Sequence, residues 1–155
     1  MSQPSLVRGV TEPALLEHTI GAALLRAART WPAQEALVSV HQGIRWTYQQ
    51  FSDAVDRLAA GFLALDLQPG DRVAVSMPNI PHMPIVYYGI LWAGGVVVPM
   101  NPLYKSREVA FVLSDSEARA LFAWDGVAEE AGKGAAEAGA EFISVVPAEF
   151  LGQVM

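Results

Sequence analysis

The chain has 155 residues, of which 52% are hydrophobic and 17% charged, and its formal net charge is −6. This length suffices for one globular domain with a real core. Ten Lys and Arg against sixteen Asp and Glu, with no basic cluster, argue against nucleic acid and anionic lipid as partners. The lack of cysteine excludes disulfides, thiolate catalysis and cysteine-based zinc sites. Together with an N-terminus that has no signal-sequence pattern, it favours a cytoplasmic location.

The first predicted elements precede the main α/β pattern. Residues 1–14 are expected to be an N-terminal extension, and residues 15–155 a partial domain. A helix is predicted over 15–31, ended by Pro32. Strands over 35–40 and 44–47 are predicted to form a hairpin. The apolar face of the first helix is predicted to consist of Leu16, Ile20, Leu24, Ala27 and Trp31.

The clearest predicted helix covers residues 47–67. Thr47 followed by Gln50 matches a capping box, in which the hydroxyl accepts a backbone N–H and the amide reaches back. Residues 68–71 then form a turn. The apolar face of this helix is predicted to consist of Phe51, Val55, Leu58, Phe62 and Leu65.

A long uncharged stretch, residues 73–104, is a candidate membrane span. Its longest possible helix, 81–93, would measure roughly 20 Å, short of a hydrocarbon core about 30 Å thick. We therefore expect strand, helix and strand, and no transmembrane segment. The residues that interrupt the stretch are Pro78, Pro81, Pro84, Pro99, Gly89, Gly94 and Gly95.

From residue 72 onward, predicted strands alternate with predicted helices. The strands cover 72–77, 96–98, 118–124 and 141–146; the helices cover 81–93, about 106–114 with Ser106 as its cap, and 127–138. Such alternation indicates a parallel sheet with helices on its faces. The predicted fold class is therefore α/β, a doubly wound, mostly parallel sheet with flanking helices, preceded by an N-terminal helix and a short hairpin.

Residues 131–134, Ala-Gly-Lys-Gly, invite comparison with a phosphate loop. Such a loop needs Ser or Thr after its Lys and lies between a strand and a helix. Here Ala135 follows Lys133 inside a predicted helix, so a surface helix is the better interpretation. His18, His41 and His82 lie in three different elements without metal-ligand spacing, and no metal site is expected.

Pro99, Asn101 and Pro102 form a stiff turn at the carboxyl end of a buried strand. Ligands of open α/β sheets bind beyond the carboxyl ends of the strands. This edge is therefore the best place for a ligand in the chain, although two prolines that simply shape a turn are the simpler interpretation. Reasoning from the residues alone ends at an α/β domain without a visible active site.

Several segments resemble the adenylate-forming (AMP-binding) enzyme family. Residues 45–51 (RWTYQQF) resemble its first core motif, residues 70–75 (GDRVAV) the turn and strand that follow, and residues 91–102 (LWAGGVVVPMNP) its second core motif. Residues 76–79 and 104–108 also resemble acyl-CoA synthetases. In order and spacing the chain is similar to the N-terminal portion of such an enzyme, most like fatty-acid–CoA ligases.

This resemblance implies an activity for the full-length enzyme. The family joins a carboxylic acid to AMP at the expense of ATP, and acyl-CoA synthetases then pass the acyl group to coenzyme A. ATP, Mg²⁺ and coenzyme A are the implied cofactors, and none is expected to bind this chain tightly. The family's phosphate loop, Thr-Glu motif, nucleotide pocket and C-terminal lysine are not found up to Met155. We therefore expect no catalytic residue in this chain and no activity from it alone.

The positions that match the family motifs are expected to be scaffold positions. They are Thr47, Tyr48, Gly70, Asp71, Gly94, Gly95, Pro99, Asn101 and Pro102.

The family branch and two alternatives remain open. Residues 101–104 and 107–108 look more like fatty-acyl-CoA and aryl-CoA ligases than peptide-synthetase domains, which favours a medium- or long-chain fatty acid as substrate. The alternatives are a non-catalytic interaction or oligomerisation module and a small nucleotide-binding α/β domain that uses the Pro99–Pro102 edge. Because a partial domain leaves apolar surface and a strand edge open, we expect self-association or a homo-oligomer.

Overall fold

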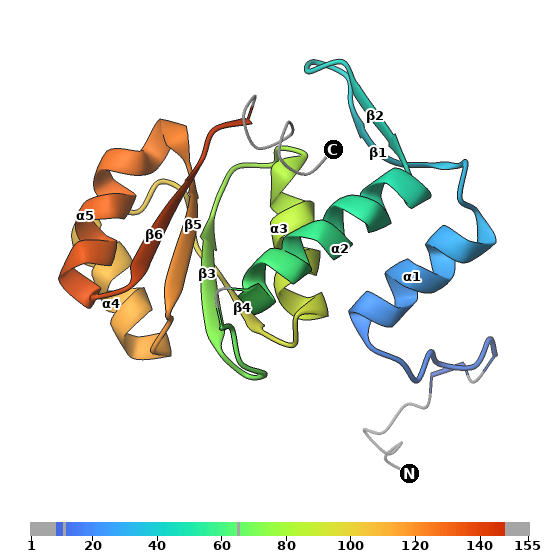
Figure 1. The fold of residues 1–155 in the computed structure, drawn as a ribbon, viewed down its shortest axis with the longest axis horizontal. Helices are drawn as coiled ribbons and strands as arrows, with labels where there is room; N and C mark the ends of the chain where they lie inside the picture. Colours follow the sequence, from blue (N-terminus) through green and yellow to red (C-terminus); the bar gives the residue numbers. More distant parts are fainter. Residues whose placement is uncertain (1–8, 11, 65, 148–155) are drawn as a thin grey trace, which may run out of the picture.

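The computed structural model describes residues 9–10, 12–64 and 66–147, and its elements form two groups along the chain (Figure 1). The first group is a helix, a two-stranded antiparallel hairpin and a long helix. The second group alternates strands and helices. The elements are α1 (Ile20–Thr30), β1 (Glu35–Ser39), β2 (Ile44–Thr47), α2 (Tyr48–Ala64), β3 (Arg72–Ser76), α3 (His82–Trp92), β4 (Val96–Pro99), α4 (Ser106–Ser116), β5 (Ala120–Trp124), the 3-10 turn η1 (Asp125–Val127), α5 (Ala128–Ala138) and β6 (Glu141–Val145).

The four strands of the second group form one parallel sheet in the order β4-β3-β5-β6. Helices α2 and α3 cover one face of this sheet, and α4 and α5 cover the other (Figure 1). The doubly wound α/β fold expected from the alternation is therefore confirmed. The chain leaves β3 toward one edge, forms β4 there, and returns past β3 to form β5 and β6.

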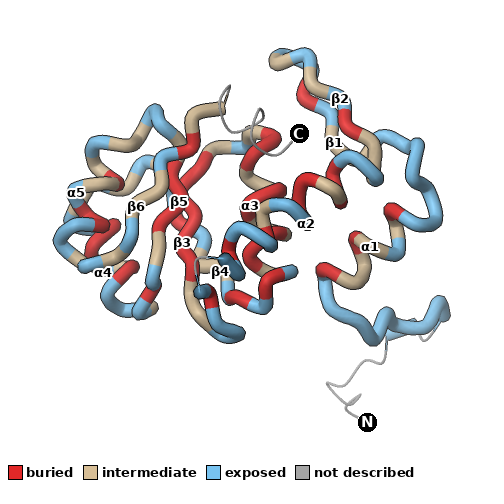
Figure 2. Tube along the Cα trace, in the orientation of Figure 1, coloured by how far each residue is buried: buried red, intermediate tan, exposed pale blue. Residues whose placement is uncertain are grey.

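Alternation along the strands divides the apolar core into two parts. Val73 and Val75 of β3 belong to the core beneath α2 and α3, together with Phe122 of β5. Ala74 and Leu121 belong to the core beneath α4 and α5. Successive side chains of a strand point to opposite faces, so covering both faces makes these strands apolar throughout. The centre of the sheet is accordingly the most continuously buried part of the trace (Figure 2).

The uncharged stretch 73–104 supplies β3, α3 and β4, as predicted. Helix α3 has 11 residues and connects β3 to β4 along the chain, and these two strands pair with each other. Among the residues that the structure describes, no helix has the length and apolar character needed to cross a membrane.

Helix α1 is shorter than predicted. It begins at Ile20, and the Thr19 hydroxyl caps it by accepting the Ala22 N–H at 3.2 Å. The expectation of helix over residues 15–19 was therefore wrong. The apolar residues keep helical spacing on both sides of Thr19, so their pattern alone does not show where the helix begins. The Thr19 side chain marks the start, because it accepts a hydrogen bond from a backbone N–H group of the first turn.

The buried face of α1 also differs from the expected one. Ile20 and Trp31 are 53% and 50% exposed, whereas Gly21, Leu24 and Ala28 are buried. A Cβ at Gly21 would lie 2.5 Å from the Trp92 ring, so only glycine lets α1 come this close to α3. Two small residues, Gly21 and Ala28, and one leucine, Leu24, therefore form the buried face, while Ile20 and Trp31 stay outside it.

The capping box of α2 is confirmed by two reciprocal hydrogen bonds. The Gln50 N–H donates to the Thr47 hydroxyl oxygen at 3.3 Å, and the Thr47 N–H donates to Gln50 Oε1 at 2.9 Å. Of the apolar face predicted for this helix, Phe51, Val55 and Phe62 are buried. Leu65 lies outside the described residues, as does most of the expected N-terminal extension.

Close packing of α5 against α4 depends on Gly134, which yields a stability prediction. An added Cβ would lie 2.6 Å from both the Ser106 carbonyl oxygen and Val109 Cβ. Gly134→Ala should therefore lower the free energy of unfolding by about 1–3 kcal/mol in urea titrations.

The matched control is Gly132→Ala in the same helix, where the new Cβ would meet the Phe142 ring at an ordinary 3.6 Å. That substitution should raise stability by about 0.5–1 kcal/mol through helix propensity. Equal stability of the two variants would contradict the packing argument.

Candidate functional site

Strands β4 and β5 end on the same side of the sheet, with β3 between them, and the ligand position was expected there. The segments after these strands line a shared hollow of about 500 Å³ formed by residues 102–105 and 125–130. Pro99 ends β4, Pro102 lines the hollow, and Asn101 Oδ1 accepts the Leu103 N–H at 3.0 Å. These three predicted positions therefore lie together, in a turn held by the asparagine side chain.

The amino end of α4 opens toward this hollow but is already occupied by carboxylates. The Lys105 N–H donates to Glu108 Oε2, and the Ser106 N–H donates to Glu130 Oε2, each at 2.9 Å. The Ser106 backbone bond, helped by the nearby Lys105 and Lys133 charges, lowers the pKa of Glu130. The cap is thus Lys105 and not Ser106, which the sequence predicted, because Ser106 is the first helical residue.

Occupied amide groups limit what this edge can bind. A helix amino end holds phosphate through unpaired N–H groups and its positive dipole. Here Glu108 and Glu130 take that role, and Asp125 and Glu129 add negative charge to the same hollow. The carboxylates around this hollow therefore oppose the binding of a phosphate group there, with Lys105 as the one cation of its lining, and no reaction step is assigned to these residues.

The carboxyl end of β3 is closed by a buried histidine. His82 begins α3 without exposed surface, and its Nε2 lies 3.1 Å from the Pro147 carbonyl oxygen just after β6. This contact joins the segments after β3 and β6 although β5 lies between those strands. Burial lowers the pKa of His82, while the Pro147 carbonyl acts in the opposite direction. A side chain without exposed surface cannot reach a ligand, so His82 serves as an internal link.

Four of the predicted scaffold positions lie at the other end of the sheet, where its strands begin. They are Gly70, Asp71, Gly94 and Gly95. The Gly70 N–H donates to the Gly94 carbonyl at 2.9 Å, and the Val96 N–H donates to the Asp71 carbonyl at 2.8 Å. Gly70 and Gly94 have φ values of 89° and 87°, which side chains other than glycine rarely adopt. Gly95 lies close to Ile90 and the Asp71 carbonyl. These residues join the turns before β3 and β4.

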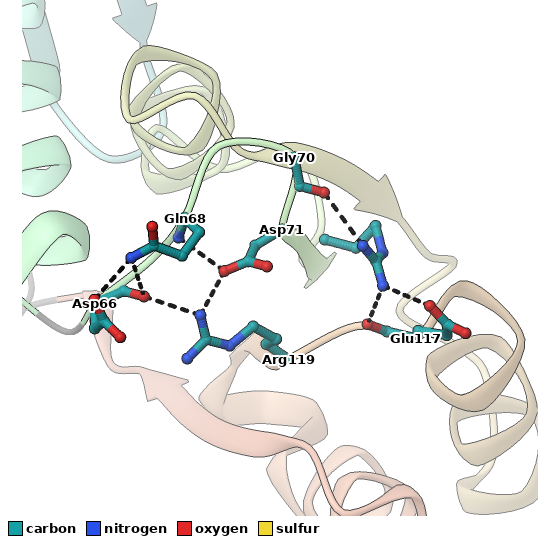
Figure 3. A network of polar contacts seen from close by, with 7 residues as sticks. Asp66, Gln68, Gly70, Asp71, Glu117 and Arg119 are labelled. Atoms are coloured by element: carbon teal, nitrogen blue, oxygen red, sulfur yellow. Dashed lines mark hydrogen bonds and ion pairs between the residues drawn. The ribbon is translucent and has the colours of Figure 1, made fainter.

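A polar network surrounds the same edge (Figure 3). Asp71 Oδ2 accepts the Gln68 N–H at 2.8 Å and forms an ion pair with Arg119, which also donates to the Asp66 carbonyl at 2.9 Å. The Gln68 bond, and then Arg119, lower the pKa of Asp71. On the other side of β3, Arg72 donates to the Glu117 carboxylate at 2.8 Å. Sequence reasoning predicted the turn over residues 68–71, which holds Gln68 and Asp71, but missed Arg119, because no local pattern links residues 48 positions apart.

The nine predicted positions thus lie in three separate places. Thr47 and Tyr48 begin α2, the Gly70–Asp71 and Gly94–Gly95 pairs join two turns, and the remaining three lie at the carboxyl edge. In the part of the chain that the structure describes, no group of three His, Asp or Glu side chains is placed to hold a metal ion.

Solved structures define the class of this fold. It is similar to that of a fatty acyl-CoA synthetase of Mycobacterium tuberculosis, with a TM-score of 0.78 and 29% identity, covering 87% of this chain and 28% of that one. It is also similar to the N-terminal domain of FACL13 from the same organism, with a TM-score of 0.73 and 28% identity over 87% of this chain and 35% of that one. The chain therefore has the fold of part of the N-terminal domain of an acyl-CoA synthetase.

Curated relatives and the family match extend this result. The AMP-binding enzyme family matches residues 24–150, and the chain belongs to that family. It is 36% identical over 117 residues to the mitochondrial medium-chain acyl-CoA ligase ACSF2 of Macaca fascicularis, covering 76% of this chain. It is 36% identical over 111 residues to the long-chain-fatty-acid–CoA ligase of Bacillus subtilis, covering 72% of this chain. The matches cover 19% and 20% of these two relatives, about a fifth of each.

The Asp71 network predicts a specific dependence of stability on pH. A carboxyl group whose pKa falls on folding stabilises the fold above its unfolded pKa of about 3.9 and loses this effect as pH falls through the folded pKa. Asp71→Asn should therefore unfold at a lower temperature than the unmodified chain at pH 7. As the pH falls below 4 and through the lowered pKa of Asp71 in the folded chain, the two melting temperatures should converge. A difference that is the same at both pH values would contradict the assigned role of the carboxylate.

Proposed function

We propose that this chain is a structural part of an ATP-dependent acyl-CoA synthetase that activates a medium- or long-chain fatty acid. In that reaction the carboxylic acid is joined to AMP with release of pyrophosphate, and the acyl group is then transferred to the thiol of coenzyme A. The observation that carries the proposal is the 36% identity to the medium-chain ligase over 76% of this chain.

Two further similarities bear on the choice of acid. The Bacillus subtilis relative is named for long-chain fatty acids. A benzoate-CoA ligase of Burkholderia xenovorans has a similar structure, with a TM-score of 0.78 and 25% identity. The curated similarities favour a fatty acid over an aryl acid, a choice that the residue pattern at 101–108 does not make, because it resembles both kinds of ligase. The cytoplasmic location expected from the sequence stays a prediction, since the Macaca fascicularis relative is mitochondrial.

The segment itself is proposed to contribute a scaffold and no catalytic group. At the carboxyl ends of its strands, three carboxylates and one cation, Lys105, line the hollow, and the backbone N–H groups of Lys105 and Ser106 already donate to Glu108 and Glu130. Its buried histidine, His82, begins α3 and contacts the Pro147 carbonyl just after β6. The same arrangement argues against the alternative of an independent nucleotide-binding domain at the Pro99–Pro102 edge. ATP, Mg²⁺ and coenzyme A would therefore bind elsewhere in a complete synthetase.

An ATP–pyrophosphate exchange assay tests the proposed inactivity of the segment. The 155-residue chain, offered short-, medium- and long-chain fatty acids and benzoate in turn with Mg²⁺ and ATP, should show no exchange above the protein-free background. The Bacillus subtilis ligase serves as the active control. Acid-dependent exchange by this chain would show that residues assigned to the scaffold perform adenylation.

A chimera tests the scaffold role itself. Residues 24–150 of this chain would replace the matching segment of the Bacillus subtilis ligase, and exchange with a long-chain acid should be retained. The same chimera carrying Gly134→Ala should yield less folded protein but a similar exchange rate per folded molecule. A folded chimera without exchange would contradict the proposal, because a scaffold of the same fold should support the host's catalytic groups.

A further inference from the structure

The strand order of the sheet defines a switch point, where the chain changes the side on which it adds strands. From β3 the chain passes through α3 to β4 on one side, and from β5 it passes through α5 to β6 on the other. Helix α3 covers one face of the sheet and α5 covers the opposite face (Figure 1). Open α/β sheets bind ligands in the crevice between the carboxyl ends of two such strands, here β3 and β5.

This crevice is closed by residues of the chain itself. Ser76, which ends β3, and Met77, which follows it, are both buried. Ala123, near the end of β5, has no exposed surface. His82 begins α3 beside these strand ends, and among the described residues it is the only ionisable residue that is buried. The switch point therefore contains an imidazole ring enclosed by protein.

Hydrogen bonding defines the chemical state of this ring. The Nε2 atom of His82 lies 3.1 Å from the Pro147 carbonyl oxygen. A carbonyl oxygen accepts hydrogen bonds and cannot donate them, so the proton must be on Nε2. Burial lowers the pKa of His82, against the smaller opposite effect of the Pro147 carbonyl. At neutral pH the ring is therefore a neutral donor, and its bond to Pro147 needs no second charge.

The bond between His82 and Pro147 crosses the sheet at its carboxyl end. His82 follows β3, Pro147 follows β6, and β5 lies between these two strands. Val145, the last residue of β6, is buried in the part of the core that α2 and α3 cover. A chain that leaves an edge strand can turn toward either face of the sheet or away from it. Here the imidazole holds it on the face of α3.

We propose that His82 is a positioning residue that closes the switch point and, by donating from Nε2 to the Pro147 carbonyl, determines the direction in which the chain leaves β6. The inference concerns this chain by itself and does not depend on the proposed enzymatic function. The place where a doubly wound sheet ordinarily binds a ligand is thus used for a contact between two segments of the same chain.

Three substitutions separate the hydrogen bond from the volume of the ring. His82→Gln keeps an N–H donor at a similar distance from the backbone, His82→Leu has a similar size but no donor, and His82→Ala leaves a space. In thermal melting followed by circular dichroism at pH 8, His82→Ala should lower the melting temperature by about 5–15 °C. His82→Leu should also lower it, and His82→Gln should recover at least half of that loss. His18→Ala, which removes an exposed imidazole before α1, should melt like the unmodified chain.

Added imidazole tests the bond directly. In His82→Ala the space left by the ring borders the Pro147 carbonyl, which accepts an N–H. Imidazole in the tens of millimolar should therefore raise the melting temperature of this variant by about 2–4 °C, and should leave that of the unmodified chain unchanged. 1-Methylimidazole has no N–H in its neutral form, so at pH 8 it should have a much smaller effect.

Amide exchange tests the effect on β6. Because the contact holds the chain just after this strand, His82→Leu should make the β6 amides exchange about tenfold faster than in the unmodified chain. The amides of β4, at the other edge of the sheet, should change less. A general loss of stability would instead accelerate exchange in both strands alike.

Four outcomes would overturn the proposal. Nitrogen NMR that finds the His82 proton on Nδ1 at pH 7 excludes the donated bond, and this measurement needs no substitution. Equal melting temperatures of the Gln and Leu variants show that the ring acts through its volume alone. Equal effects of imidazole and 1-methylimidazole on His82→Ala exclude a role for the N–H. Unchanged exchange of the β6 amides in His82→Leu shows that the contact does not hold the end of the strand.

Discussion

β3 is the strand on which the rest of the structure depends, because it is covered on both faces and paired along both edges. Val73, Ala74 and Val75 have 0–2% of their surface exposed. The strand pairs with β4 on one side and with β5 on the other. Helices on opposite faces of the sheet therefore share a single strand as their common support. Loss of its pairing would separate the two parts of the core from each other.

Polar residues at the amino end of β3 set the position of this strand. Asp71 and Arg72 each bond to residues that precede β5, and the Asp71 carbonyl also begins the pairing with β4. Two glycines with positive φ, Gly70 and Gly94, bring the turns before β3 and β4 together. The family motif positions in this region are thus explained by strand registration, a task that requires no ligand. Matching a family motif and contributing to chemistry are separate properties of a residue.

Local signals in the sequence predicted the elements well because each has a local cause. The apolar run of β3 and the Thr47–Gln50 capping box both act within a few residues. The start of α1 and its buried face were predicted incorrectly. Apolar spacing shows which side chains share one side of a helix, but not which of them other elements cover. Contacts such as His82 with Pro147 join distant segments, and no periodicity reports them. The same limit hid Glu130, which reaches the Ser106 N–H from α5, whereas Glu108 bonds to Lys105 within the first turn of α4.

The proline at the outer edge of β4 has a consequence for aggregation. Strand pairing through unprotected sheet edges allows indefinite addition and leads to fibres. The Val96 and Met100 N–H groups donate toward β3, so Val97 and Pro99 face outward, and Pro99 removes one of the two donors that this edge would offer to a foreign strand. The residue that ends the strand for the fold thereby also makes the edge a poor template for another chain.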